Sequence, residues 1–129
     1  MSPGLSSGGF RVRGIEDVSE KNALRVALVW NGTVMQEKTF RLPSDSGQVT
    51  IGETRANTYV IHGENVPQTH SLFQKQSAGY KLELLPGMTG KLSVQGSEVN
   101  VADSDRRSFS VSGGDYGTIN YHGVTLFFQ

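Results

Sequence analysis

From residue 23 onward, the hydrophobic pattern alternates over short distances and predicts β-strands. No window of about 11 or more residues places apolar side chains at the i, i+3, i+4 and i+7 positions of an amphipathic helix. Short β-rich segments recur about every 8 to 12 residues, with turn-forming residues between them, which is typical of a sandwich or barrel. Counting these segments gives roughly eleven strands, so the sequence predicts an all-β fold, a β-sandwich of about eleven strands.

Turn-forming residues place the hairpins between these strands. Asn and Gly tolerate positive φ angles, so Asn31-Gly32 suits a tight turn between residues 23–30 and 34–42. Further hairpin turns are expected at residues 76–79, Gln95-Gly96 and His122-Gly123. The glycine content is therefore explained by turns and requires no phosphate-binding loop.

Alternation also predicts which side chains are buried. Val34, Gln36 and Lys38 alternate with Met35, Glu37 and Thr39, so one face of this strand is expected to stay in water. The aromatic residues in strand-like segments are assigned to core packing. They are Trp30, Phe40, Tyr80, Phe109, Phe127 and Phe128.

The first 22 residues differ in composition from the rest. They are rich in Gly and Ser, and their few apolar residues follow neither the helix nor the strand period. We expect residues 1–22 to be a flexible leader and residues 23–129 to be the folded domain. A leader that folds onto a partner is the alternative.

Composition limits the function classes. The 129 residues suffice for one domain, and the formal net charge is +0, with 12 basic and 12 acidic residues. A nucleic-acid-binding domain usually carries a basic excess, so nucleic acid is not an expected partner. There is no cysteine, which excludes disulfides and permits a cytoplasmic setting. The longest apolar run, "ALVW", is far too short to span a bilayer.

Catalytic and metal-binding patterns are weak. His62, His70 and His122 lie at no ligand spacing from one another, so we expect structural or surface histidines and no metal. The sequence has no G-x-S-x-G elbow and no Gly-rich nucleotide-binding motif. Arg106-Arg107 follow Asp103 and Asp105, which is typical of a solvated turn. We therefore expect neither an enzyme nor a cofactor.

A series of short strings in order along the chain resembles the forkhead-associated (FHA) domain family. They are "TIG", "NTYVI", "VPQTH", "GYKLELL" and "TGKLSVQG". The family pattern is a strand ending in Gly-Arg, then Asn-Asp-Ile, a Ser-x-x-His loop, a Gly-Tyr-x-Leu strand and Thr-Asn-Gly. The resemblance covers roughly residues 24–129 and implies an eleven-stranded sandwich that binds phosphothreonine peptides.

Compared residue by residue with the family pattern, this sequence matches the scaffold positions but not the ligand-binding positions. Gly52 and Asn57 match family positions, and His70 matches the histidine that braces the loop, so a structural role is implied for all three. The phosphate-binding Arg is replaced by Glu53, and the phosphate-binding Ser by Pro67. A carboxylate repels phosphate, and proline offers neither a hydroxyl nor an N–H. The asparagine that holds the peptide backbone falls at Thr89 or Gly90.

Longer strings resemble a degenerate FHA-like module of myxobacterial-type gliding-motility proteins. They are "LRVALVWNGTVMQEKTF", "TIGETRANTYVI", "MTGKLSV" and the ending "FFQ". In those proteins the module is the cytoplasmic N-terminus of a membrane-anchored chain, followed by a transmembrane helix and TonB-like periplasmic regions. This resemblance implies that the chain is the cytoplasmic domain of an inner-membrane protein, with the anchor beyond Gln129.

The leading hypothesis is a non-catalytic protein–protein interaction module that is phosphate-independent and recruits a cytoplasmic protein or peptide. We expect it to be monomeric and to make no direct contact with the membrane. The resemblance assigns partner binding to loop residues Glu53, Arg55, Asn65, Gln68, Thr69 and Thr89. Three alternatives stay open: phosphothreonine recognition with Arg55 and Thr69 or Ser71 as substitutes, a structural spacer in an envelope-spanning assembly, and, last, an enzyme.

Overall fold

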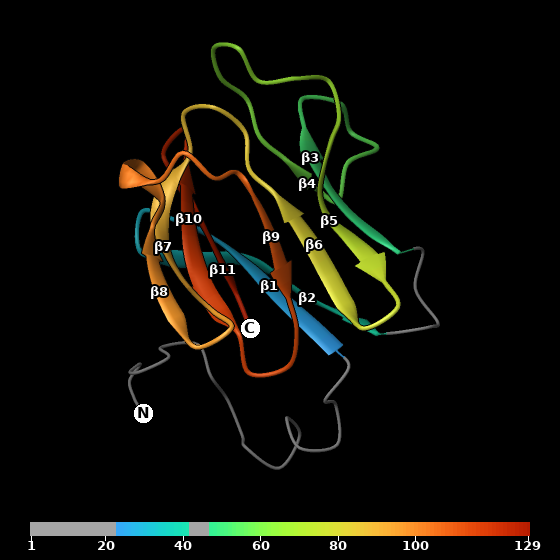
Figure 1. Cartoon of the computed structure of the whole chain (residues 1–129). Coiled ribbons are helices and arrows are strands. Elements are labelled where there is room, and N and C mark those ends of the chain that lie inside the picture. The colour runs from blue at the N-terminus through green and yellow to red at the C-terminus, as the bar shows by residue number, and fades with distance from the viewer. Residues whose placement is uncertain (1–22, 42–46) are drawn as a thin grey trace.

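The computed structural model describes residues 23–41 and 47–129, which form two packed β-sheets (Figure 1). The predicted flexible leader, residues 1–22, and most of the loop at 43–47 lie outside the described residues. The strands are β1 (Ala23–Trp30), β2 (Thr33–Arg41), β3 (Gln48–Gly52), β4 (Tyr59–Val60), β5 (His70–Gln76), β6 (Gly79–Glu83), β7 (Thr89–Val94), β8 (Ser97–Asn100), β9 (Ser108–Val111), β10 (Tyr116–Tyr121) and β11 (Val124–Phe128).

The two sheets have six and five strands. Their orders are β2-β1-β11-β10-β7-β8 and β4-β3-β5-β6-β9. The paired neighbours are antiparallel, except that β4 runs parallel to β3. The described residues contain one short helical element, a 3₁₀ turn at Val101–Asp103 that Asn100 caps. The predicted all-β sandwich is confirmed.

Three hairpin turns form where the sequence predicts them. Asn31-Gly32, Gln95-Gly96 and His122-Gly123 each have two consecutive residues with positive φ, as in the two-residue turns that match strand twist. The hairpin between β5 and β6 also forms within residues 76–79. Local turn chemistry therefore accounts for four of the strand connections.

The core lies between the sheets and is centred on aromatic side chains. The rings of Phe73 on β5 and Phe128 on β11 meet edge to face, with centroids 5.3 Å apart. Tyr59 is fully buried, and its hydroxyl donates a 2.7 Å hydrogen bond to the Val26 carbonyl on β1. Burial, and then the negative charge of Glu37, raises the pKa of Tyr59. Because β1 and β4 belong to different sheets, this bond joins the two layers.

The prediction for Trp30 was wrong, and β2 is more exposed than the prediction of one wet face required. Both faces of β2 are exposed from Thr33 to Lys38, and Trp30 is 55% exposed instead of packing in the core. β2 is an edge strand whose pairing shifts register at Leu28/Val29. Lys38 approaches β4, and its ammonium lies 5.6 Å from the Tyr59 ring centroid. Neither sheet of residues 23–41 and 47–129 covers the hairpin tip before Lys38, so alternation does not bury either face there.

Replacing Tyr59 with Phe should lower the free energy of unfolding by about 1–2 kcal/mol, because the change removes a buried donor while keeping the ring. Urea denaturation followed by tryptophan fluorescence measures this difference. Tyr116→Phe removes the same hydroxyl from a side chain that is 53% exposed and should have almost no effect. Equal losses in the two variants would mean that the bond between the layers does not stabilise the fold.

Candidate functional site

Three loops and one turn converge at one end of the sandwich, at the top of Figure 1. They are the β3–β4 loop at 53–58, the β4–β5 loop at 61–69, the β6–β7 loop at 84–88 and the β10–β11 turn at His122-Gly123. We call this end the loop face. Most of the loop residues predicted to bind a partner belong to it, so its internal contacts decide which of their groups are available.

The β3–β4 and β4–β5 loops are joined through Asn57 and Gly52. Asn57 is buried, and its amide nitrogen donates to the carbonyls of Thr54 at 2.9 Å and of Gln68 at 2.8 Å, and to the Thr54 hydroxyl at 2.9 Å. A side chain at Gly52 would overlap the Gln68 carbonyl, so glycine is required where the two segments pass. These contacts agree with the structural roles expected for both residues.

Backbone bonds extend this junction beyond the end of β3. The Glu53 N–H donates to the Pro67 carbonyl at 3.1 Å, and the Thr54 N–H donates to the Gln68 carbonyl at 3.3 Å. The Glu53 carboxylate reaches from the β3–β4 loop to the β4–β5 loop, where its Oε2 accepts the Gly63 N–H at 3.3 Å. Glu53 therefore stabilises the β4–β5 loop and brings a negative charge into the loop face.

The imidazole ring of His122 holds the β4–β5 loop against the β10–β11 turn. The imidazole of His122 packs on Gly63 so closely that a methyl group at Gly63 would overlap it. The same imidazole meets the Tyr121 ring edge to face, with centroids 4.6 Å apart. Burial raises the pKa of Tyr121. The glycine at position 63 is thus explained by a neighbouring side chain, since its own φ is not positive.

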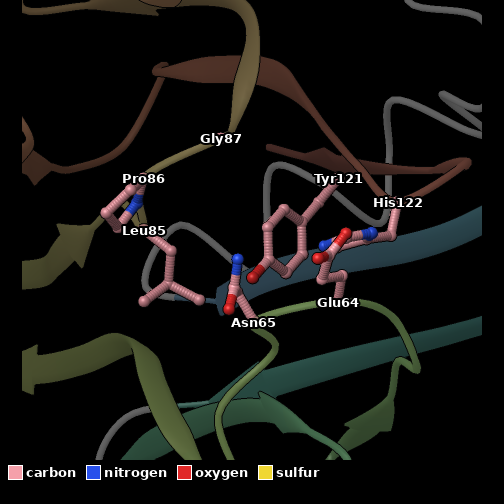
Figure 2. A pocket seen from close by; sticks show the side chains of 7 residues that line it. All are labelled: Glu64, Asn65, Leu85, Pro86, Gly87, Tyr121 and His122. Carbon is pink, nitrogen blue, oxygen red and sulfur yellow. The ribbon is translucent and has the colours of Figure 1, made fainter.

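A pocket of about 640 Å³ opens between these segments. Figure 2 shows Leu85 and Pro86 of the β6–β7 loop toward one side, and Glu64 and His122 toward the other. Asn65 and Tyr121 lie between them in this view. The pocket thus combines apolar walls, two aromatic rings, one amide and one carboxylate, and it falls in the size range of ligand sites in proteins.

The predicted partner-binding residues divide into groups with different roles. Arg55 is exposed and has no hydrogen bond or ion pair to any described residue. Asn65 lines the pocket with a positive φ of 65°. The carbonyl of Gln68 holds the loops together while its side chain is exposed. The Thr69 hydroxyl lies 3.4 Å from the Thr54 hydroxyl.

Thr89 lies apart from this group. It begins β7 and pairs with Asn120 of β10. Strand alternation places Leu92 and Val94 in the core and leaves Thr89 exposed with Lys91 on the outer side of the six-stranded sheet. Among the described residues, no hydrogen bond or ion pair connects Thr89 to the other predicted loop residues.

The ring of His70 makes a different contact from the brace to the loop that the resemblance implies. His70 is half-buried, and its Nε2 lies 2.8 Å from the Glu83 carbonyl oxygen of β6. The ring therefore ties the start of β5 to the end of β6. The Glu83 side chain accepts a 2.7 Å bond from the Ser108 hydroxyl and lies 3.3 Å from the Lys81 ammonium.

The described part of the chain contains no group of three or more His, Cys, Asp or Glu residues placed to hold a metal ion. Arg106 and Arg107 each contact a neighbouring group of the fold. The guanidinium of Arg106 packs on the Phe109 ring at 4.5 Å, and Arg107 donates to the Met88 carbonyl at 3.4 Å. No helix among residues 23–41 and 47–129 is long and apolar enough to cross a membrane.

Comparison with known proteins identifies no family for this chain. No protein-family model matches the sequence, and the curated proteins contain no match. The candidate site therefore depends on the geometry described above.

The sequence did not predict the pocket, because its walls come from two loops and one turn that are distant along the chain. Glu64, Leu85, Pro86, Tyr121 and His122 were not among the predicted site residues. One local signal was present at His122, which occupies the first position of a two-residue turn where Asn, Asp or Gly is usual. A bulky ring in that position suggests a packing or binding role for the turn.

Replacing Asn57 with Ala should lower the free energy of unfolding by about 1–3 kcal/mol, because several bonds donated by a buried amide are lost together. Backbone amides at 53–58 and 67–69 should also exchange faster in hydrogen-exchange measurements. Gln68→Ala is the matched control, since only the carbonyl of Gln68 takes part in the junction. Slow exchange retained at these loops in the Asn57 variant would contradict the role of the amide.

Replacing Ser108 with Ala should raise the pKa of Glu83. The bond from the Ser108 hydroxyl is the largest influence that lowers this pKa from the usual 4.5, ahead of the neighbouring Lys81. A carboxyl whose pKa is lowered by folding stabilises the fold above the unfolded-state pKa, and this contribution is lost as the pH falls through the folded-state pKa. Carboxyl ¹³C NMR titration measures the midpoint. An unchanged midpoint in Ser108→Ala would show that the hydroxyl does not stabilise the carboxylate.

Proposed function

We propose that this chain is a non-catalytic protein–protein interaction module on an FHA-like scaffold, and that its loop face binds a protein or peptide without requiring phosphate. The observation that carries the proposal is the placement of Glu53. Its carboxylate lies inside the loop face, bonded to the Gly63 N–H, where the resemblance to the FHA family calls for a phosphate-binding arginine.

The scaffold supports this interpretation. Eleven strands in two sheets agree with the architecture that the resemblance implies. Gly52 and Asn57, the two residues that match the family pattern at the loops, hold the β3–β4 and β4–β5 loops together. Such a rigid scaffold below a set of joined loops is a common design for a recognition surface.

The electrostatics of the loop face disfavour an anionic ligand. Glu53 and Glu64 both lie on it, and Pro67 lacks the hydroxyl and N–H that would bind a phosphate oxygen. Arg55 is the cation of the β3–β4 loop and is exposed. A neutral or basic partner segment therefore fits this surface better than a phosphopeptide does.

The setting that follows from the second resemblance is the cytoplasmic side of a bacterial inner membrane. The domain would recruit a cytoplasmic protein to a membrane-anchored motility or envelope complex. An interaction domain in this position needs no catalytic residues, since tethering alone raises the local concentration of the partner.

One further candidate is phosphothreonine recognition by substitute residues. Arg55 is exposed without a described partner, and the hydroxyls of Thr54 and Thr69 lie next to each other at the edge of the same loops. Together they supply a cation and two hydroxyls. Under this alternative, Arg55→Ala would abolish binding of a phosphopeptide, whereas the proposed function predicts no phosphate-dependent binding to lose.

Titration of the chain with a phosphothreonine peptide library should give only millimolar or weaker affinities. Each charge-assisted contact to phosphate contributes about 1.5–3 kcal/mol, so loss of the Arg and Ser contacts removes roughly two to four decades of affinity. Calorimetry or NMR chemical shifts measure the binding. A peptide that binds below about 50 μM, with its unphosphorylated form at least tenfold weaker, would overturn phosphate independence.

The double variant Glu53→Arg, Pro67→Ser tests the same point in reverse, because it should gain phosphopeptide affinity if the loops keep the family geometry. Glu98→Arg makes the same charge change on exposed strand β8 and should gain nothing specific.

Partner capture by the immobilised domain is a second test. Capture should be lost in the Glu53→Arg, Gln68→Ala variant and retained in Glu98→Arg, and equal capture by both would refute recognition through the loop face.

A further inference from the structure

The pocket of the loop face offers a negative site beside aromatic and apolar walls. Glu64 supplies the carboxylate, and the pocket lining includes no Lys or Arg to neutralise it. The second carboxylate of the loop face, that of Glu53, is held on the adjacent Gly63 N–H. An incoming anion would meet repulsion here, whereas a cation would be attracted.

The walls suit a cation that carries an apolar stem. In Figure 2 the side chains of Leu85 and Pro86 lie toward the end of the pocket opposite the Glu64 carboxylate. The Tyr121 ring and the Asn65 amide lie between these ends. Arg and Lys side chains combine a methylene stem with a charged head, so they can pack along apolar walls while the head reaches a carboxylate.

The planar groups of the pocket favour a guanidinium over an ammonium. His122 presents an exposed imidazole ring that packs edge to face on the buried Tyr121 ring, and a guanidinium can stack on an exposed ring while it bonds to a carboxylate through two N–H groups. An ammonium is a compact, strongly hydrated charge and loses more solvation on entering a pocket with apolar walls.

The pocket is held in shape before any ligand binds. Asn65 and His122 have φ angles of 65° and 46°, in the left-handed region that most residues avoid. A positive φ is usual in two-residue hairpin turns, but Asn65 is not part of such a turn. The contact of the His122 ring with Gly63 fixes the two loops that carry these residues. Strained residues held together by packing often mark a binding site, and prior ordering lowers the entropy lost on binding.

We infer that this pocket binds an arginine side chain of the partner, with the guanidinium on the Glu64 carboxylate beside the His122 ring and the methylene stem along Leu85 and Pro86. The inference rests on the proposed function and adds the chemistry of the recognised residue. The volume of about 640 Å³ exceeds what one side chain needs, so neighbouring residues of an extended segment also fit.

The test uses n-butylguanidinium as the probe, titrated into the ¹⁵N-labelled chain and followed by amide chemical shifts. Saturable shifts should appear at residues 63–65, 85–87 and 121–123, with an affinity in the millimolar range expected of a fragment. Neutral n-butylurea has nearly the same shape and should bind at least about fivefold more weakly, with n-butylammonium between them. Inorganic phosphate should produce no saturable shift in this pocket.

Two variants test the assigned contacts. Glu64→Gln should weaken n-butylguanidinium binding about five- to tenfold, while Glu98→Gln, an equivalent change on β8, should leave the affinity unchanged. Gly63→Ala should displace the His122 ring and weaken binding without loss of the folded amide spectrum. Equal binding of n-butylguanidinium and n-butylurea, no effect of Glu64→Gln, or saturable phosphate shifts at these residues would each overturn the inference.

The outcome separates this inference from the proposed function. If the probe does not bind, but loop-face variants still abolish partner capture, the arginine pocket is refuted and the interaction module stands. If the probe binds as expected, but partner capture survives every loop-face variant, the proposed function is refuted.

Discussion

The close approach of the Gly52 backbone to the Gln68 carbonyl sets the geometry of the loop face. Only glycine can occupy this crossing, and the Asn57 amide holds the two segments together through the same carbonyl. The backbone bonds of Glu53 and Thr54 then continue the pairing beyond β3. Without this junction, the β4–β5 loop would lack its anchor on the sandwich, and the contact of Gly63 with His122 could not form.

This arrangement places buried, loop-joining groups and exposed side chains within a few residues of one another. Buried amide and carbonyl groups connect the loops, while Arg55, the Gln68 side chain and Thr69 remain exposed. Glu53 has two effects on the loop face. Its backbone N–H bonds to the Pro67 carbonyl, and its carboxylate adds a negative charge next to Gly63. A substitution at Glu53 therefore changes loop geometry and electrostatics together, and experiments on the loop face need a variant that changes charge elsewhere.

The parts of the structure that follow local rules could be predicted from the sequence. The X-Gly turns gave correct hairpins, because the chemistry of these segments is set by neighbours along the chain. Trp30 was assigned wrongly, and the tip of β2 is more exposed than predicted, since the sequence pattern does not reveal where the opposing sheet ends.

The candidate site was predictable only in part. The resemblance pointed to Gly52, Asn57 and the residues around them, and the described contacts explain why those residue types stand there. The pocket depends on the meeting of Glu64, Pro86 and His122, which are far apart in sequence. Neither periodicity nor spacing carries that information, because loop packing at one end of a sandwich is set by the whole fold.

The open edge of β2 has a consequence for the behaviour of the protein in concentrated solution. In the described part of the chain, β2 pairs on one side only, and Val34 and Met35 are about half exposed. The formal net charge of the chain is +0, so copies do not repel one another over long distances. Resistance to edge-to-edge association therefore depends on local features of this strand, namely its register shift and the charges of Glu37 and Lys38. Among the four edge strands of the described sheets, β2 thus affects colloidal stability through features that lie outside the loop face.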